Sequence, residues 1–432
     1  MTSFHETSAG TTTELRDGAT AYTVVADAAR AAAAAAGALA AASDATVDGA
    51  LVAMARRLRE AAEPIVAANA ADMAAAVADG MSGGLLDRLR LDEARIAAMA
   101  GQLTTLAEVA PRSRRRIVRE IGDGLVLEER QRPVGVIGAN FEARPNVVVD
   151  VASQLVKSRN AGVLRTGSAA MASAAALVDH VVGPALTDAG LPAEAIQLIR
   201  LRGHESAAAL VSQGRLLPLV ILRGSGESTR SLARTAALHD VRTLAHADGG
   251  AVLYLDREAD RAKAADLIDA SLDRLGVCNR LNLLLVHRAI WDEVVPGIVA
   301  TLADRTPAIR ASLPPHGHPL GYEWALDPVD EASVTIAPVD GATDAAYLAN
   351  EQTSGLAAAI VTEDAAAAAE FLDGYTGTGA FWNATTRLLD GFKLLALPET
   401  GINIDRVPGP RGPVTFRDLH VRQYVVVPAD RG

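Results

Sequence analysis

Short apolar runs bounded by glycine or charged residues alternate with helix-like segments from about residue 124 to residue 382, and this alternation constrains the fold more than any other feature. Strands separated by helices predict parallel sheets of the α/β class. The strand-like runs cover residues 124–127, 134–138, 162–165, 196–201, 219–222, 252–255, 283–286, 333–336, 358–361 and 379–382. The helix-like segments between them include residues 147–155, 169–182, 260–275, 291–303 and 365–372.

The chain has 432 residues, more than the ~250–300 that one hydrophobic core usually serves, so we expect at least two domains. A boundary near residue 245 separates the first strand–helix series from the second. Residues 1–20 are polar and are expected to form a disordered tail, and the rest of the first hundred residues is helical, with one helix predicted over 46–69. We therefore assign residues 21–244 to a first domain and residues 245–375 to a second.

The charge balance excludes some classes of partner. Asp and Glu number 52 against 41 Lys and Arg, and a net charge of -11 gives no electrostatic reason to bind nucleic acid or an anionic membrane. The alanine-rich segment 24–42 is too weakly hydrophobic to predict a membrane span. The first 17 residues lack the apolar core of a secretory signal, and a single cysteine suits a reducing compartment, so we expect a cytoplasmic protein.

Cys278 is the only cysteine, and it directly precedes the mostly apolar run 281–286. A single thiol cannot form an intrachain disulfide, so it either fills the core, as free cysteines often do, or performs chemistry. A thiol at the start of a strand, beside a glycine and an amide, is presented to a ligand on a rigid element. From the residues alone both uses stay open.

The segment Glu142-Ala143-Arg144-Pro145-Asn146 follows a strand-like run, where ligands of open α/β sheets bind. Arg144 is suited to bind an anion in a bidentate manner, and Asn146 to donate a hydrogen bond to an oxyanion. Equally, Asn146 can cap the following helix while Arg144 remains an exposed charge.

Other polar motifs give weaker signals. Gly224-Ser225-Gly226 follows a strand but lacks the third glycine of a dinucleotide fingerprint, so its backbone N–H groups either face a phosphate or form an ordinary turn. The arginine-rich stretch 112–119 is interpreted as a solvated helix face or a set of ion-pair partners. His316 and His318 have no cysteine or second pair to support metal binding, so we predict no metal site.

Several motifs, in order and spacing, resemble the gamma-glutamyl phosphate reductase family of the aldehyde dehydrogenase superfamily. The resemblance covers roughly residues 25–428. The matching segments are Asp87-Arg88-Leu89-Arg90-Leu91, Glu93-Ala94-Arg95-Ile96, Pro133-Val134-Gly135-Val136-Ile137, residues 142–147, Val277-Cys278-Asn279, residues 360–364, Asn383-Ala384-Thr385-Thr386-Arg387 and Arg411-Gly412-Pro413.

This resemblance implies an aldehyde dehydrogenase-like α/β fold. It has a Rossmann-type cofactor domain, here residues 21–244, and an α/β catalytic domain with Cys278, here 245–375. It also implies an oligomerisation β-hairpin that includes residues 121–132, and a segment, 376–432, that returns to the cofactor domain and supplies an oligomerisation strand. A homodimer or dimer-based oligomer is expected.

The family's activity, carried over, is NADPH-dependent reduction of L-glutamate 5-phosphate to L-glutamate 5-semialdehyde in proline biosynthesis. Cys278 matches the nucleophile, and Asn146 matches the amide that stabilises the oxyanion. Because the nucleophile must be a thiolate, we expect the site to lower the pKa of Cys278. The expected substrate-binding residues are Arg144, Glu142 and Asn279, and the expected cofactor-binding residues are Arg165, Gly167, Ser168, Gly224 and Ser225.

The sequence departs from the family pattern around its ligands. The usual Gly-Gly-Ser-Glu is Thr166-Gly167-Ser168-Ala169, which removes a carboxylate suited to the cofactor ribose and leaves NAD open beside NADP. The glutamate four residues after the cysteine is Asn282, the usual Gly-Ser-Gly-His-Thr-Asp is residues 353–358, and the carboxyl-terminal motif is residues 395–403. These changes also suit an oxidoreductase acting on a different acyl phosphate, acyl thioester or amino-acid semialdehyde, or a non-catalytic scaffold.

The segment Ala247-Asp248-Gly249-Gly250 matches the place where hydrolytic aldehyde dehydrogenases carry a general-base glutamate. No glutamate precedes the glycines here, and Asp248 is one residue out of register. Without a base to activate water, a thioester would hydrolyse slowly, which favours acyl transfer to phosphate over oxidation to a free acid.

Overall fold

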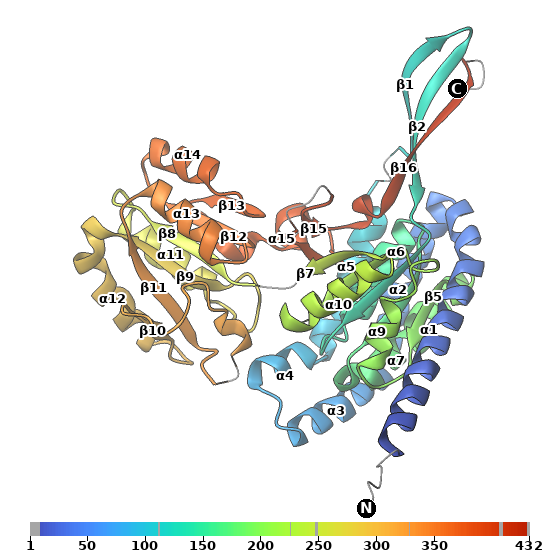
Figure 1. Ribbon diagram of the computed structural model, residues 1–432, viewed down its shortest axis with the longest axis horizontal. Helices are drawn as coiled ribbons and strands as arrows, with labels where there is room; N and C mark the ends of the chain where they lie inside the picture. The colour runs from blue at the N-terminus through green and yellow to red at the C-terminus, as the bar shows by residue number, and fades with distance from the viewer. Residues whose placement is uncertain are drawn as a thin grey trace, which may run out of the picture.

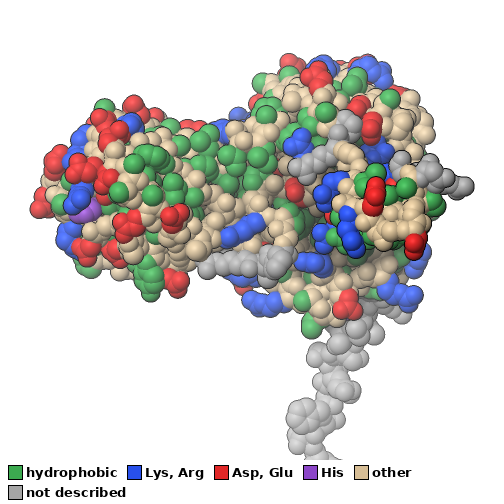
Figure 2. Space-filling view, turned by 90° about the horizontal axis from the view of Figure 1, so that it is seen from above, with side chains coloured by type: hydrophobic (Ala, Val, Ile, Leu, Met, Phe, Trp, Pro, Cys, Tyr) green, Lys and Arg blue, Asp and Glu red, His purple; other side chains and the backbone are tan. Residues whose placement is uncertain are grey.

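The protein consists of two α/β lobes and a projecting β-arm (Figure 1). The structure is a computed structural model that describes residues 9–110, 113–224, 226–246, 249–327, 329–405 and 409–429, with the backbone alone for residues 9–19 and 246. In the space-filling view of Figure 2, acidic side chains gather on the smaller lobe and basic side chains are more frequent on the larger one.

The larger lobe is built on a five-stranded parallel sheet with the order β5-β4-β3-β6-β7. The strands are β3 (Val136–Phe141), β4 (Ala161–Thr166), β5 (Ile196–Ile199), β6 (Leu219–Arg223) and β7 (Arg242–His246). The chain passes from β3 to β4 and β5 on one side and then returns to β6 and β7 on the other. The carboxyl ends of β3 and β6 therefore flank the crevice where dinucleotides bind in such sheets.

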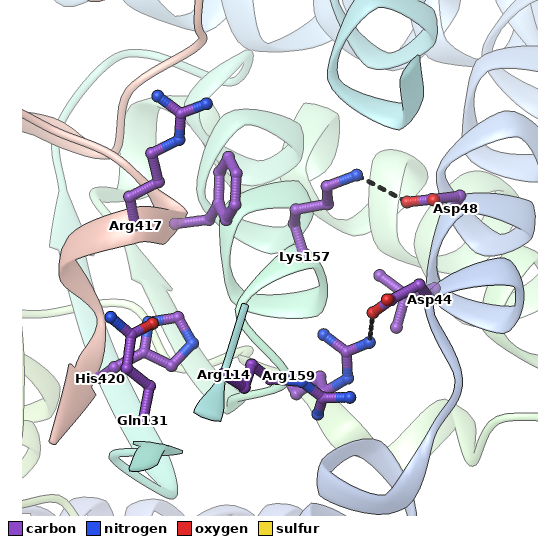
Figure 3. Close-up of a pocket in the computed structure, with 10 residues that line it drawn as sticks. Asp44, Asp48, Arg114, Gln131, Lys157, Arg159, Arg417 and His420 are labelled. Atoms are coloured by element: carbon purple, nitrogen blue, oxygen red, sulfur yellow. Dashed lines mark hydrogen bonds and ion pairs between the residues drawn. The ribbon is translucent and has the colours of Figure 1, made fainter. Parts of the chain in front are cut away.

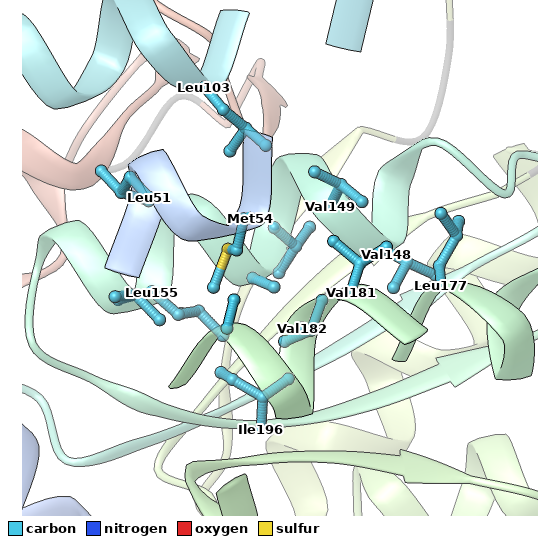
Figure 4. Packing of buried hydrophobic residues seen from close by; sticks show 14 of the residues in the cluster. Leu51, Met54, Leu103, Val148, Val149, Leu155, Leu177, Val181, Val182 and Ile196 are labelled. Carbon is cyan, nitrogen blue, oxygen red and sulfur yellow. The ribbon is translucent and has the colours of Figure 1, made fainter. Parts of the chain in front are cut away.

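Helices cover both faces of this sheet. They are α1 (Ala9–Ala41), α2 (Asp44–Glu60), α3 (Ala62–Ala78), α4 (Gly83–Leu89), α5 (Glu93–Glu108), α6 (Val147–Lys157), α7 (Met171–Leu177), a π-helical turn (Val178–Val182), α8 (Gly183–Asp188), α9 (Glu205–Leu210) and α10 (Gly226–Leu238). Figure 4 shows Met54 of α2 and Leu103 of α5 packed with Val148 of α6, in a core that continues to Ile196 of the sheet. Burying these apolar side chains fixes the helical region on the sheet.

The alanine-rich helix α1 packs on the opposite face, where Val25, Ala29 and Ala32 are buried against strands of the sheet. Small side chains on one face let the helix approach the strands closely. By length and composition alone, Thr20–Ala41 and Ser168–Asp188 would suffice to cross a membrane, and the second is mostly buried in the core. The helix α1 begins at Ala9, so the described part of the expected disordered tail is helical.

The smaller lobe holds a six-stranded parallel sheet with the order β10-β11-β9-β8-β12-β13. Its strands are β8 (Ala251–Leu255), β9 (Leu281–His287), β10 (Arg310–Ser312), β11 (Ser333–Val339), β12 (Ala357–Val361) and β13 (Gly379–Trp382), and its helices are α11 (Arg261–Ser271), α12 (Trp291–Ala303), α13 (Ala342–Gln352) and α14 (Ala365–Gly374). One apolar cluster lies between the sheet and α11 and α12, and another between the sheet and α13 and α14.

The returning segment begins later than residue 376, because β13 still pairs in register with β12. It contains α15 (Gly391–Leu395), β14 (Gly401–Asn403) and β15 (Gly412–Val414) and leads into the arm strand β16 (His420–Pro428). Short 3₁₀ helices occupy Ser168–Ala170, Ala193–Ala195, Arg288–Ile290, Trp324–Leu326, Thr386–Leu388 and Phe416–Asp418.

The arm is an antiparallel sheet in which β2 (Leu125–Pro133) lies between β1 (Arg115–Gly122) and β16. The arginine-rich stretch therefore lies on a strand, not on a helix, because β1 pairs with β2. Its expected ion-pair role is confirmed, since Arg115 pairs with Glu128 and Arg116 with Glu129 (3.3 Å).

Two ion pairs anchor the helical region at the base of the arm (Figure 3). The buried Lys157 donates to Asp48 Oδ1 (2.6 Å) and to the carbonyl of Val109 (3.0 Å), and the buried Arg159 pairs with Asp44. Both acids lie at the start of α2, and both cations lie at the end of α6. These contacts fix α2 on the sheet lobe beside the root of the arm.

Candidate active site

Cys278 lies on the turn between α11 and β9, as the sequence predicts. Its backbone carbonyl accepts a hydrogen bond from the N–H of Gly250 (2.7 Å), which directly precedes β8. Because β8 and β9 are paired parallel strands, this bond ties the cysteine turn to the amino-terminal edge of the smaller sheet. The thiol is thus carried by a rigid element, which a nucleophile requires.

Gly249 leaves no room for a side chain beside the cysteine. A Cβ at Gly249 would lie 2.8 Å from both Cα and Cβ of Cys278, and it would also clash with Glu323. The segment with Glu323 is positioned by Asn282, which donates to the carbonyl of Tyr322 (2.6 Å) and accepts from the N–H of Trp324 (3.0 Å). Glu323 therefore brings a carboxylate to the Gly249–Cys278 contact, while Ala247 and Asp248 lie outside the described residues.

A pocket of about 1440 Å³, counted with its open mouth, lies between the lobes and contains Cys278 in its wall. Its apolar lining includes Met81, Leu85, Leu326 and Ile402. Its charged lining consists of Arg88, Arg144, Arg223, Glu142, Asp327, Glu331 and Glu399. Apolar walls with a few convergent charged groups are the usual form of a small-molecule binding site.

Three arginines of the lining act electrostatically on the cysteine. Arg88 donates its Nε–H to the carbonyl of Gly276 (2.6 Å), whereas the guanidinium groups of Arg144 and Arg223 form no hydrogen bond or ion pair with the residues that the structure describes. Burial and the neighbouring Arg88 and Arg223 lower the pKa of Arg144 to about 9. Guanidinium groups that line a pocket and are not hydrogen-bonded to a carboxylate are suited to bind an anion.

The surroundings of Cys278 disfavour the thiolate on balance. Burial raises the pKa of Cys278, and the carboxylate of Glu323 adds to this, while Arg144, Arg223 and Arg88 oppose it. The expectation of a lowered pKa is therefore wrong for the structure as it stands, because removal from water outweighs the three cations.

Glu399 is the lining residue with the most perturbed carboxylate. Its Oε2 accepts the N–H of Gly391 (2.9 Å), and burial raises its pKa to about 7, against the opposing charge of Arg223. This carboxyl group changes protonation near neutral pH, which is typical of functional sites.

Asn146 precedes α6 but makes no capping hydrogen bond with its side chain. Its Nδ2 instead donates to Asp150 Oδ2 (2.9 Å), and burial raises the pKa of Asp150 to about 6. The carboxyl group of Asp150 fixes the orientation of the amide, as an oxyanion donor would need. Asn146 is outside the lining of the pocket itself.

Of the expected cofactor-binding residues, the two glycines lie beside Glu142 at the ends of their strands, whereas Arg165 points elsewhere. Gly224 lines the pocket at the end of β6, and a Cβ there would lie 3.1 Å from the carboxylate of Glu142. Gly167 faces Glu142 from the end of β4, Ser168 beside it is exposed, and Ser225 lies outside the described residues.

Arg165 points into the lobe instead of the crevice. It donates to Ser206 Oγ (3.0 Å), Asn140 Oδ1 (3.1 Å) and the carbonyl of Gly203 (2.6 Å). These bonds engage three of its five N–H donors and hold Arg165 against the ends of the strands.

Asn279 also lies away from the pocket, contrary to its expected role with substrate. It is buried, donates to the carbonyl of Leu389 (2.9 Å) and accepts from Arg387, which itself pairs with Asp273 (2.6 Å). The segment around Arg387 thus holds the cysteine turn in place. Asn279 follows Cys278 in the sequence, but its side chain points away from the pocket because the turn reverses the chain.

Sequence reasoning missed Arg88, Arg223, Glu331 and Glu399 as pocket residues. Arg88 belongs to the motif at residues 87–91 and Glu399 to the carboxyl-terminal motif at residues 395–403, but nothing in the sequence placed them in one pocket with Cys278. Arg223 ends β6, and the rule that ligands bind at the carboxyl ends of strands could have identified it.

A cysteine between a Rossmann-type lobe and a second α/β lobe defines a class of oxidoreductase, and the comparisons with known proteins agree. The aldehyde dehydrogenase family model matches residues 5–311. The chain belongs to this family, which implies an enzyme that acts on a small aldehyde or acyl substrate with a nicotinamide cofactor.

Within the family the chain is grouped with gamma-glutamyl phosphate reductases. The enzyme of that name from Synechococcus elongatus is 35% identical over 385 residues, 87% of each chain. The one from Clavibacter michiganensis is 36% identical over 388 residues, 88% of each chain. The crystal structure of gamma-glutamyl phosphate reductase from Thermotoga maritima superimposes with a TM-score of 0.82 at 26% identity, covering 93% of this chain and 98% of that one.

Proposed function

We propose that the protein reduces L-glutamate 5-phosphate to L-glutamate 5-semialdehyde and phosphate with NADPH, through a thioester on Cys278, in proline biosynthesis. The observation that carries the proposal is the pocket that brings together Cys278, Arg144 and Arg223, whose guanidinium groups form no ion pair with the described residues. An acyl phosphate supplies both an electrophile for the thiol and a dianion for the arginines.

In the first step the thiolate of Cys278 attacks the acyl carbon, the carbon–oxygen bond to phosphate breaks, and phosphate leaves with the electron pair. The arginines stabilise the charge that develops on the departing phosphate. Their charges also favour the thiolate form of Cys278. Arg144 is our candidate for the main phosphate contact.

In the second step the thioester carbonyl becomes a tetrahedral thiohemiacetal oxyanion, which collapses to aldehyde and thiolate. Asn146, oriented by Asp150, and the backbone N–H of Cys278 are our candidates for stabilising that oxyanion. The nicotinamide cofactor, when bound, supplies the hydride. The crevice fits a dinucleotide, because Gly224 lies at the β3/β6 switch point and the helix α10 starts two residues later, at Gly226.

The assembly is also a proposal. The arm exposes Ile117 and Val118 on β1 and Tyr424 and Val426 on β16, an apolar surface that a second copy of the chain would cover. We therefore propose a homodimer or dimer-based oligomer. Size-exclusion chromatography with light scattering tests it, and a monomer at micromolar concentration would refute it.

The activity is tested in the oxidative direction with glutamate semialdehyde, phosphate and either NADP or NAD. The proposal predicts phosphate-dependent formation of NADPH that Cys278→Ala abolishes, with a preference for NADP. If another aldehyde is consumed instead, the substrate is wrong. If no aldehyde is consumed and no dinucleotide binds, the protein is not an enzyme of this kind.

A further inference from the structure

Glu331 and Arg88 flank the backbone at Gly276, two residues before the cysteine. Arg88 donates its Nε–H to the carbonyl of Gly276 (2.6 Å), and a Cβ on Gly276 would lie 3.3 Å from Glu331 Oε1. Both side chains belong to the pocket wall. A fixed cation and a fixed anion therefore lie close together at one end of the pocket.

The carboxylate of Glu331 is held by packing, and the guanidinium groups of Arg88 and Arg280 are near enough to feel its charge. It lies against the Cα of Gly84 so closely that any side chain there would clash with it. Within the described residues it accepts no hydrogen bond and forms no ion pair, although its own backbone carbonyl accepts from Arg280 (2.6 Å). A carboxylate that lines a pocket in this way is prepared to receive a cationic group of a ligand.

The backbone at Gly276 lies within reach of a substrate whose acyl carbon is at Cys278. Two residues span at most about 7 Å of chain, so the backbone at Gly276 lies within that distance of Cys278. The reacting carbon of a five-carbon amino acid is separated from its α-carbon by three bonds, about 4 Å when extended. When the acyl carbon is at the thiol, the α-amino-acid end therefore reaches the Gly276 region.

We infer that Glu331 and Arg88 form a clamp for the α-amino-acid end of the substrate, with Glu331 binding the α-ammonium group and Arg88 the α-carboxylate. The inference rests on the proposed function and extends it, because it makes the enzyme selective for α-amino-acid substrates over plain dicarboxylic ones. Arg144 and Arg223 are then left for the phosphate at the reacting end.

The experiment compares two aldehydes that differ by the amino group, glutamate 5-semialdehyde and 5-oxopentanoate, each with phosphate and NADP. Glu331→Gln keeps the shape of the side chain but removes its charge. We expect kcat/KM for glutamate semialdehyde to fall about 10- to 100-fold, mainly through KM, while kcat/KM for 5-oxopentanoate changes less than about twofold. Asp330→Asn, next in sequence and paired with Arg310 (3.1 Å) outside the pocket, is the matched control.

The outcomes separate the clamp from the proposed function. Equal losses for both aldehydes, or no loss for either, would overturn the clamp alone. If the wild type forms no NADPH with either aldehyde, the proposed function fails, and protection of Cys278 from iodoacetamide still decides the clamp. L-glutamate should then protect better than glutarate in the wild type, and the two should protect equally in Glu331→Gln. Equal protection in the wild type would refute the clamp.

Discussion

Gly249 and Cys278 are in direct backbone contact: a Cβ on the glycine would lie 2.8 Å from the Cα and the Cβ of the cysteine. Gly249 is itself fixed, because its carbonyl accepts a hydrogen bond from Ser354 Oγ (2.9 Å). Neither side of the contact can move without disturbing a strand of the smaller sheet. The position of Cys278 therefore depends on residue 249, which precedes the neighbouring strand β8, having no side chain.

Gly249→Ala is expected to displace the cysteine turn and to reduce kcat at least about tenfold, because small displacements of reacting atoms are costly. The phosphate-dependent NADPH assay measures the loss. Gly297→Ala, in α12 with open space around its Cα, is the matched control and should leave kcat unchanged. Full activity in Gly249→Ala would show that the turn adapts to the extra carbon.

The balance of charges around Cys278 can be shifted in both directions. Arg144→Gln removes a charge that favours the thiolate, so the pKa of Cys278 should rise further, and Glu323→Gln removes one that opposes it, so the pKa should fall. The pH dependence of iodoacetamide labelling measures both shifts. The same direction of shift in the two variants would contradict the electrostatic account.

The sequence was sufficient to predict most of the parallel strands. The predicted helix over residues 291–303 coincides with α12, and each of the buried runs in the two sheets became a strand. Among the elements that were not predicted, the strand β7 is an edge strand with few apolar residues, and the helix α13 is short and polar on its outer face. The helix expected over 46–69 is two helices that meet at Ala61, and Pro64 in the first turn of α3 was the available signal.

The site was harder to predict, because its charges come from distant parts of the chain. Cys278 and Arg144 follow local rules about strand ends and motifs. Arg88 and Glu331 are 243 positions apart and meet only because α4 lies against the smaller lobe at Gly84 and Gly276. For Asn279 the sequence suggested a contact that is absent: its neighbour Cys278 lines the pocket, whereas the amide of Asn279 donates to the carbonyl of Leu389 and supports the turn on the side away from the pocket.

Asp48→Asn should destabilise the protein by about 1–3 kcal/mol, because it removes the negative charge that pairs with the buried ammonium group of Lys157. Asp48 is itself about one-third exposed, which limits the effect. Urea unfolding monitored by circular dichroism measures the change. Asp27→Asn, which breaks an exposed pair with Arg30, is the control and should change the stability by less than about 0.5 kcal/mol.

Burial of two carboxyl groups at the site should make the fold less stable as the pH rises. The pKa values of Asp150 and Glu399 are raised to about 6 and about 7, above their ordinary values of 3.8 and 4.5. Between about pH 4 and pH 7 the folded state therefore binds more protons than the unfolded state, and the free energy of unfolding falls through this interval. Other groups add their own dependence, so the comparison is made between variants.

The stability of Asp150→Asn and of Glu399→Gln, each measured relative to the wild type, should increase as the pH rises from 5 to 8, by an amount on the order of 1–3 kcal/mol. Parallel curves for the wild type and both variants in urea unfolding would show that these carboxyl groups are solvated in the folded protein.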